Sequence, residues 1–106
     1  MLLQISPRDL KDRLDSPNPP VVLDVREPAE IAIARMPGAI EIPMNEVPRR
    51  LEEIPSEREV VVVCHHGMRS AQVASFLVDR GRTGVLNLSG GIDAWSLQVD
   101  PSVRRY

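Results

Sequence analysis

The sequence is short and has few cysteine and aromatic residues, and each of these shortages excludes some kinds of structure or site. Its 106 residues leave room for one domain spanning 1–106, because domains commonly need about 100–150 residues. Cys64 is the only cysteine, so there is no internal disulfide, and we expect no structural metal site, which would want four ligands. Aromatic residues make up 3% of the chain. Trp95, its only tryptophan, is therefore expected in the core rather than on a binding platform.

The chain also lacks an excess of either charge and any long apolar stretch. Thirteen basic and fifteen acidic residues give a net charge of −2, and their signs are interspersed, which argues against nucleic acid or a membrane surface as a partner. The longest apolar stretch, residues 60–64, is far shorter than the roughly 20 residues that span a bilayer. Residues 1–5 do not resemble a signal peptide. We expect a soluble, cytoplasmic protein with a reduced thiol.

What the chain does contain is an alternation of short apolar runs and helical patterns. The runs predict strands over residues 21–25, 39–42, 59–63 and 85–88. Helices are expected over residues 7–14 behind a Ser6 cap, over 28–33, 45–54 and 70–80, and around Trp95. In the helix over 70–80, the expected apolar face consists of Ala71, Ala74, Leu77 and Val78. This order predicts a parallel α/β sheet with helices on both faces.

The candidate site lies at the end of the most strongly predicted strand. Cys64 follows four valines and precedes a helix, and ligands of open α/β sheets bind beyond the carboxyl ends of the strands. The backbone amides of the loop, with Gly67 free to adopt a left-handed conformation, would cradle an anion and stabilise a thiolate. Arg69 would add a cationic fork suited to oxyanions. His65 and His66 could add further charge when protonated.

Taken one by one, these residues have ordinary explanations. A cysteine after a valine run is more often a small buried apolar side chain than a nucleophile. Adjacent histidines rarely point to one metal ion, and Arg69 alone could be a solvated helix residue. The combination of thiol, cations and glycine within six residues is what indicates a reactive cysteine that binds anions.

Four stretches of the chain resemble the single-domain rhodanese-like sulfurtransferases. They are residues 23–27 (LDVRE), residues 37–40 (PGAI) with Ile42 and Pro43, residues 64–70 (CHHGMRS) and residues 88–95 (LSGGIDAW). Their order and spacing make the resemblance specific, and it covers most of the chain. It implies the rhodanese fold, a five-stranded parallel sheet flanked by helices.

The resemblance also implies a site and a reaction. The family's active-site cysteine corresponds to Cys64, and its substrate-binding loop corresponds to His65, His66, Gly67, Met68 and Arg69. The implied reaction moves a sulfur atom from a small anionic donor such as thiosulfate, or from a persulfide donor, through a Cys64 persulfide to a thiophile. Cyanide, a low-molecular-weight thiol or a sulfur-relay protein could serve as acceptor, and no cofactor or metal is needed.

One position departs from the family pattern. Many relatives carry a histidine just before the turn at residues 36–39, where this chain has Arg35, so that histidine's contribution is missing here. Within the LDVRE stretch, Asp24, Arg26 and Glu27 could be an acid/base set, but a structural role that joins the strand end to neighbouring loops is the preferred interpretation.

Two other classes of function stay open from the residues. The first is a phosphatase or arsenate reductase, which also needs a cysteine in an oxyanion cradle. Related phosphatases carry a loop one residue longer than the stretch from Cys64 to Arg69. The second is a non-enzymatic interaction module, which the fold can become when the cysteine is lost. The presence of Cys64 and Arg69 argues against it.

Overall fold

The computed structural model describes residues 3–106, and a single five-stranded sheet runs through them. Its strands are β1 (Leu3–Ile5), β2 (Val21–Asp24), β3 (Ile40–Glu41), β4 (Val60–Val63) and β5 (Val85–Leu88). They lie in the order β1-β5-β4-β2-β3, and every neighbouring pair is parallel. β4 is therefore the middle strand. The predicted parallel α/β sheet is confirmed.

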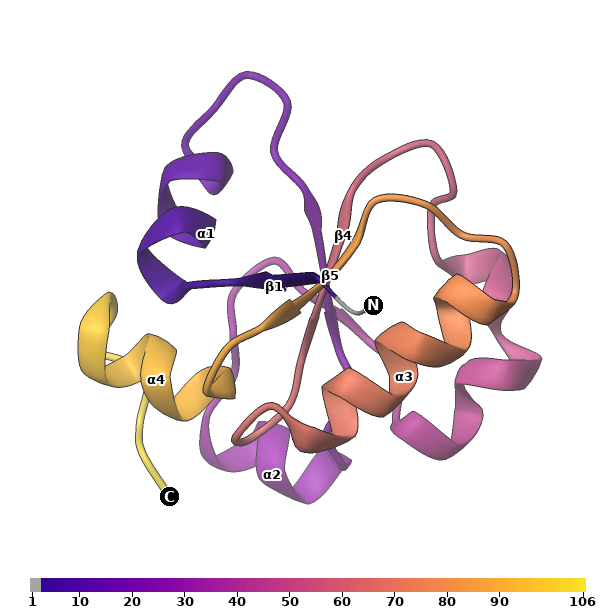
Figure 1. Cartoon of the computed structure of the whole chain (residues 1–106). Coiled ribbons are helices and arrows are strands. Elements are labelled where there is room, and N and C mark those ends of the chain that lie inside the picture. Colours follow the sequence, from indigo (N-terminus) through magenta and orange to yellow (C-terminus); the bar gives the residue numbers. More distant parts are fainter. Residues whose placement is uncertain (1–2) are drawn as a thin grey trace.

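Helices cover both faces of the sheet, as expected (Figure 1). α1 (Pro7–Leu14) and α4 (Gly91–Gln98) pack on one side, and α3 (Met68–Asp79) lies on the other with the 3₁₀ helices η1 (Met44–Arg49) and η2 (Leu51–Glu53). α2 (Pro28–Ile33) follows β2 near the edge where the central strand ends. Successive side chains of a strand point to opposite faces, so β4 supplies both cores: Val60 and Val62 to one, Val61 and Val63 to the other. Cys64 packs in the same core as Val60 and Val62.

The helix expected over residues 45–54 is wrong as an α-helix. The chain forms the two 3₁₀ helices there, with Pro48 inside the first. Proline has no N–H to donate and its ring collides with the carbonyl four residues earlier, so an α-helix cannot run through it. The side chains expected on one face, Val47, Leu51 and Ile54, still pack against the same core.

Two other sequence-based assignments need adjustment. Only four strands were assigned from the residues. β1 was missed because it has three residues, fewer than the four to eight over which an apolar–polar alternation indicates a strand. α3 begins at Met68 rather than residue 70, and its buried face is Ser70, Val73, Ala74 and Leu77, whereas Val78 is exposed. A count of apolar positions missed this face because one of its buried residues, Ser70, is polar.

Two further expectations concern the core and the chain's opening residues. Trp95 is buried, as expected, with 5% of its surface exposed. Of residues 1–5, which carried the expectation about a signal peptide, the first two lie outside the described residues. Within residues 3–106, no helix has the length and apolar character needed to cross a membrane.

Candidate active site

The candidate site is the loop that joins the central strand β4 to α3. Cys64 follows directly on the strand, and Gly67, with φ +106°, turns the chain into the first residue of the helix. A Cβ at Gly67 would lie 3.4 Å from Leu88 O and from Gly90 N, which is about van der Waals contact. The backbone angle is what favours glycine here, because residues with a side chain rarely adopt it. Cys64 is 2% exposed, so its thiol forms the floor of the loop.

Two groups contact the sulfur of Cys64. The backbone N–H of Gly67 donates to Sγ at 3.1 Å, and Ser70 Oγ lies 3.3 Å from it. Ser70 also donates to Asn87 Oδ1, and Asn87 is held in this orientation because its Nδ2 donates to Gly67 O at 3.1 Å. Ser70 has one proton to offer to Asn87 or to a thiolate. Sγ thus has one backbone donor and one hydroxyl that can either donate or accept.

The carbonyl groups of the loop point elsewhere and have their own partners. Two of them accept hydrogen bonds from the N-terminal amides of α4. Ile92 N–H donates to Cys64 O at 2.8 Å, and Asp93 N–H donates to His65 O at 3.1 Å. This contact requires Gly91, because a Cβ there would lie 2.5 Å from Cys64 O and 2.4 Å from His65 O. With its carbonyls held by α4, the loop is free to turn an amide toward the sulfur.

Arg69 lies next to the loop in sequence, but its guanidinium group is already hydrogen-bonded to another side chain. Its two terminal nitrogens donate to the two carboxylate oxygens of Glu30 on α2, at 2.7 and 2.8 Å. These bonds lower the pKa of Glu30 to about 2. They also raise the pKa of Arg69 above its ordinary value, and a charge on Cys64 adds to that effect. The sequence analysis expected a free fork for an oxyanion; in the structure Glu30 occupies it.

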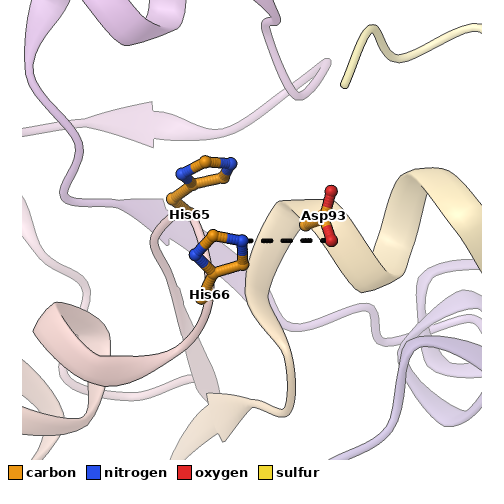
Figure 2. A group of neighbouring side chains, drawn as sticks. All are labelled: His65, His66 and Asp93. Carbon is orange, nitrogen blue, oxygen red and sulfur yellow. Dashed lines mark ion pairs between the residues drawn. The ribbon is translucent and has the colours of Figure 1, made fainter. Parts of the chain in front are cut away.

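His65 and His66 form the rim of the loop with Asp93 of α4. The two imidazole rings stack with their centroids 3.9 Å apart, and His66 Nε2 lies 4.0 Å from Asp93 Oδ2 (Figure 2). In the described part of the chain, this trio is the group whose side chains could hold a metal ion together, with ligand atoms within 4.8 Å of one another. Arg105 pairs with the same carboxylate at 2.8 Å. The position of Asp93 is therefore explained by an ion pair.

Most of the remaining residues singled out from the sequence form ion pairs or helix caps that stabilise the fold. Asp24 and Arg26 form a fully buried ion pair with N–O contacts down to 2.7 Å, which agrees with the structural interpretation. Glu27 caps α2 in a reciprocal arrangement with Glu30. Arg35 pairs with Glu41 at 2.8 Å. Met68 is 77% exposed.

Sequence reasoning assigned no role to four residues that shape this site: Glu30, Ser70, Asn87 and Tyr106. A polar Asn87 inside the otherwise apolar run 85–88 was a usable signal, because a buried amide needs partners. Ser70 belongs to the CHHGMRS stretch and could have been noticed there. Glu30 and Tyr106 come from distant parts of the chain, and no local pattern marks them.

Comparisons with known proteins agree with this fold. A family model described as the rhodanese-like domain matches residues 6–98. A sulfurtransferase of Allochromatium vinosum is 42% identical over 103 residues, covering 97% of this chain and 96% of its own. The thiosulfate sulfurtransferase GlpE of Pseudoalteromonas translucida is 29% identical over 85 residues, covering 80% of this chain and 81% of its own. The crystal structure of a rhodanese-like domain protein from Staphylococcus aureus superposes with a TM-score of 0.86 at 30% identity, covering 99% of each chain.

The fold and these relatives define a sulfurtransferase domain of the rhodanese type. The chain belongs to the rhodanese-like domain family.

Proposed function

We propose that the protein transfers the outer sulfur atom of thiosulfate to a thiophilic acceptor through a persulfide on Cys64. The observation that carries the proposal is the position of Sγ: a buried thiol at the end of the central strand, 3.1 Å from the Gly67 amide. No second thiol is available in the chain. The loop residues His65, His66, Gly67, Met68 and Arg69 would surround the donor.

The first half of the reaction forms one sulfur–sulfur bond and breaks another. The Cys64 thiolate attacks the outer sulfur of thiosulfate, and the electron pair of the donor's own sulfur–sulfur bond leaves with sulfite. Three negative charges enter this step and three leave it, one on the persulfide and two on sulfite. No proton or external electron is required.

The second half regenerates the thiolate. An acceptor with a free electron pair, such as cyanide or a thiolate, attacks the terminal sulfur of the persulfide, and the bonding pair returns to Cys64 Sγ. The site must therefore stabilise an anion in each state, first a thiolate and then a persulfide. A fixed amide such as that of Gly67 meets this need without reorganising during the reaction.

Ser70 and Asn87, the polar side chains next to Cys64, could accommodate both the thiol and the thiolate form of the cysteine. While Cys64 is a thiol, it can donate to Ser70 Oγ, which in turn donates to Asn87. Once the proton is lost, rotation of the Ser70 hydroxyl can supply a donor to the sulfur. A cysteine kept only for packing would need none of these partners.

Beyond cyanide, we propose that the acceptor is a thiol or a sulfur-relay protein. A protein acceptor would have to reach the rim of the loop, where His66 and Met68 are exposed. A reducing compartment such as the cytoplasm would keep the single thiol available between turnovers.

The test follows the sulfur atom itself. Incubation with thiosulfate should raise the intact mass of the protein by one sulfur atom, and cyanide should remove it with formation of thiocyanate. Cys64→Ser should show neither change while keeping the thermal unfolding midpoint of a folded protein. Turnover that persists in the Cys64→Ser variant would overturn the covalent mechanism.

A further inference from the structure

The segment after α4 returns to the rim of the site, where Tyr106 contacts His65. Three contacts fix its course. Val103 is 5% exposed and belongs to the core on the α1 and α4 side. Arg105 pairs with Asp93. Tyr106 then reaches the loop, where its ring stacks on the imidazole of His65 with centroids 3.9 Å apart and planes 9° from parallel.

The ring of Tyr106 closes one face of His65. The ring of His66 also stacks on His65 at 3.9 Å, and two rings cannot occupy the same face at that distance. His65 therefore lies between them, and its Nε2 is buried without a hydrogen-bond partner. The orientation of this imidazole is set by ring packing, since no hydrogen bond fixes its Nε2.

The hydroxyl of Tyr106 contacts a second part of the site. It accepts a hydrogen bond from Arg26 Nη1 at 3.1 Å and donates one to Glu30 Oε1 at 3.0 Å. Arg26 is fixed by the buried carboxylate of Asp24, and Glu30 holds Arg69. The Tyr106 hydroxyl thus connects Arg26, which follows β2, to the Glu30–Arg69 ion pair.

We propose that Tyr106 is a positioning residue of the sulfur-transfer site, whose ring sets the conformation of the loop rim at His65 and whose hydroxyl sets the Glu30–Arg69 pair. This inference rests on the proposed function for its kinetic consequences. It goes beyond that function because Tyr106 lies 42 positions after Cys64 and outside the residues that match the family model. Tyr106 acts through His65 and Glu30 and takes no part in the chemical step.

The two contacts can be separated by substitution. Tyr106→Phe keeps the ring and removes the hydroxyl, so the Glu30–Arg69 pair loses its link to Arg26 while His65 stays covered. Because Arg69 carries the nearby positive charge, we expect kcat/KM for the thiosulfate dianion to fall about tenfold, the usual effect of one hydrogen bond to a charged group. A neutral organic persulfide donor should be affected much less.

Tyr106→Leu removes both contacts and uncovers His65. We expect kcat/KM to fall for both donors, by about a hundredfold if the rim moves by roughly 1 Å. The matched control is Arg104→Ala, an exposed neighbour in the same segment, which should behave as the unmodified protein. Tyr106→Phe should keep the thermal midpoint of the unmodified protein.

Two measurements do not depend on sulfur transfer. The rate at which neutral iodoacetamide alkylates Cys64 reports the geometry of the loop, and it should change in Tyr106→Leu and stay unchanged in Arg104→Ala. Tyr106 is the only tyrosine, so selective isotope labelling gives one set of ring signals in an NMR spectrum. Alkylation of Cys64 should shift these signals.

The outcomes separate the two proposals. Wild-type kcat/KM for both donors in Tyr106→Leu, together with an unchanged alkylation rate, would overturn the positioning role. Equal losses for both donors in the Phe and Leu variants, in step with lowered thermal midpoints, would reduce Tyr106 to a stabilising residue. If the unmodified protein transfers no sulfur from either donor, the proposed function fails, while alkylation and the tyrosine signals still decide whether Tyr106 and Cys64 are coupled.

Discussion

Gly91→Ala tests the claim that contact between α4 and the loop sets the geometry of the site. A methyl group at this position would lie 2.4 Å from His65 O and 2.5 Å from Cys64 O. Both neighbours are backbone atoms that cannot rotate away, so the His65 carbonyl would have to retreat by about 1 Å to reach van der Waals distance, and a misplacement of that size can cost about a hundredfold in rate. The φ of +63° adds about 1–2 kcal/mol of strain for a residue with a side chain.

The control for Gly91→Ala is Gly81→Ala. Gly81 also has a positive φ, +89°, but a methyl group there would meet nothing within 4 Å. Both variants should lose thermal stability through backbone strain, by about 4–8 °C for each kcal/mol in a domain of this size. Only Gly91→Ala should lose kcat/KM for sulfur transfer and alter the alkylation rate of Cys64. If the two variants retain equal activity per folded molecule, the contact between α4 and the loop does not control the site.

Three further predictions concern charge and loop size. Arg69 holds the pKa of Glu30 at about 2, so the ionised carboxylate stabilises the folded state fully above its ordinary pKa of about 4.5, and that stability is lost as pH falls from there toward 2. Glu30→Gln should therefore be less stable than the unmodified protein at neutral pH, and a gap that does not narrow between pH 4.5 and 2 in denaturant titrations would contradict this. Asp24→Asn should cost about 3–5 kcal/mol in unfolding free energy, because it leaves the charge of Arg26 buried without its partner; a loss below 1 kcal/mol would show that Arg26 finds water or another acceptor. Aryl phosphates should not be hydrolysed, because the loop from Cys64 to Arg69 is one residue shorter than that of the related phosphatases and we expect it to be too tight for a tetrahedral phosphate. Phosphate hydrolysis that matches sulfur transfer in rate and disappears in Cys64→Ser would favour the phosphatase hypothesis.

The parts of the fold that the sequence predicts well are those with a local cause. The valine run before Cys64 predicts a buried strand because β-branched side chains suit the pleated surface, and the structure has β4 there. The helix expected over residues 28–33 matches α2 to the residue, since Pro28 suits the first position of a helix. Errors occur where the local pattern is ambiguous. Pro48 lies inside an apolar periodicity that looks helical, and β1 has one buried residue.

The candidate site divides in the same way. The loop from Cys64 to Arg69 is contiguous, so its thiol, its amides and its helix could be placed together from the residues alone. Its partners come from far along the chain: Glu30 lies 39 positions before Arg69, and Tyr106 lies 76 positions after Glu30. Such pairs exist only once the sheet order has brought α2 and the segment after α4 to the same edge. A sequence pattern gives residue types and spacing but does not specify that order.

These distant partners change how the site is understood electrostatically. From the sequence, Arg69 is a free cation that attracts an anionic donor; in the structure its charge is matched by Glu30 at 2.7 Å. A donor with two negative charges therefore meets a paired arginine and the backbone amides of the loop, and can gain from Arg69 only by competing with a carboxylate. Glu30 is in turn restrained by the Tyr106 hydroxyl. On the proposed function, we expect the strength with which Glu30 is held to determine how much of the positive charge of Arg69 is available to the donor. The preference for an anionic over a neutral donor would then depend on Glu30 and Tyr106.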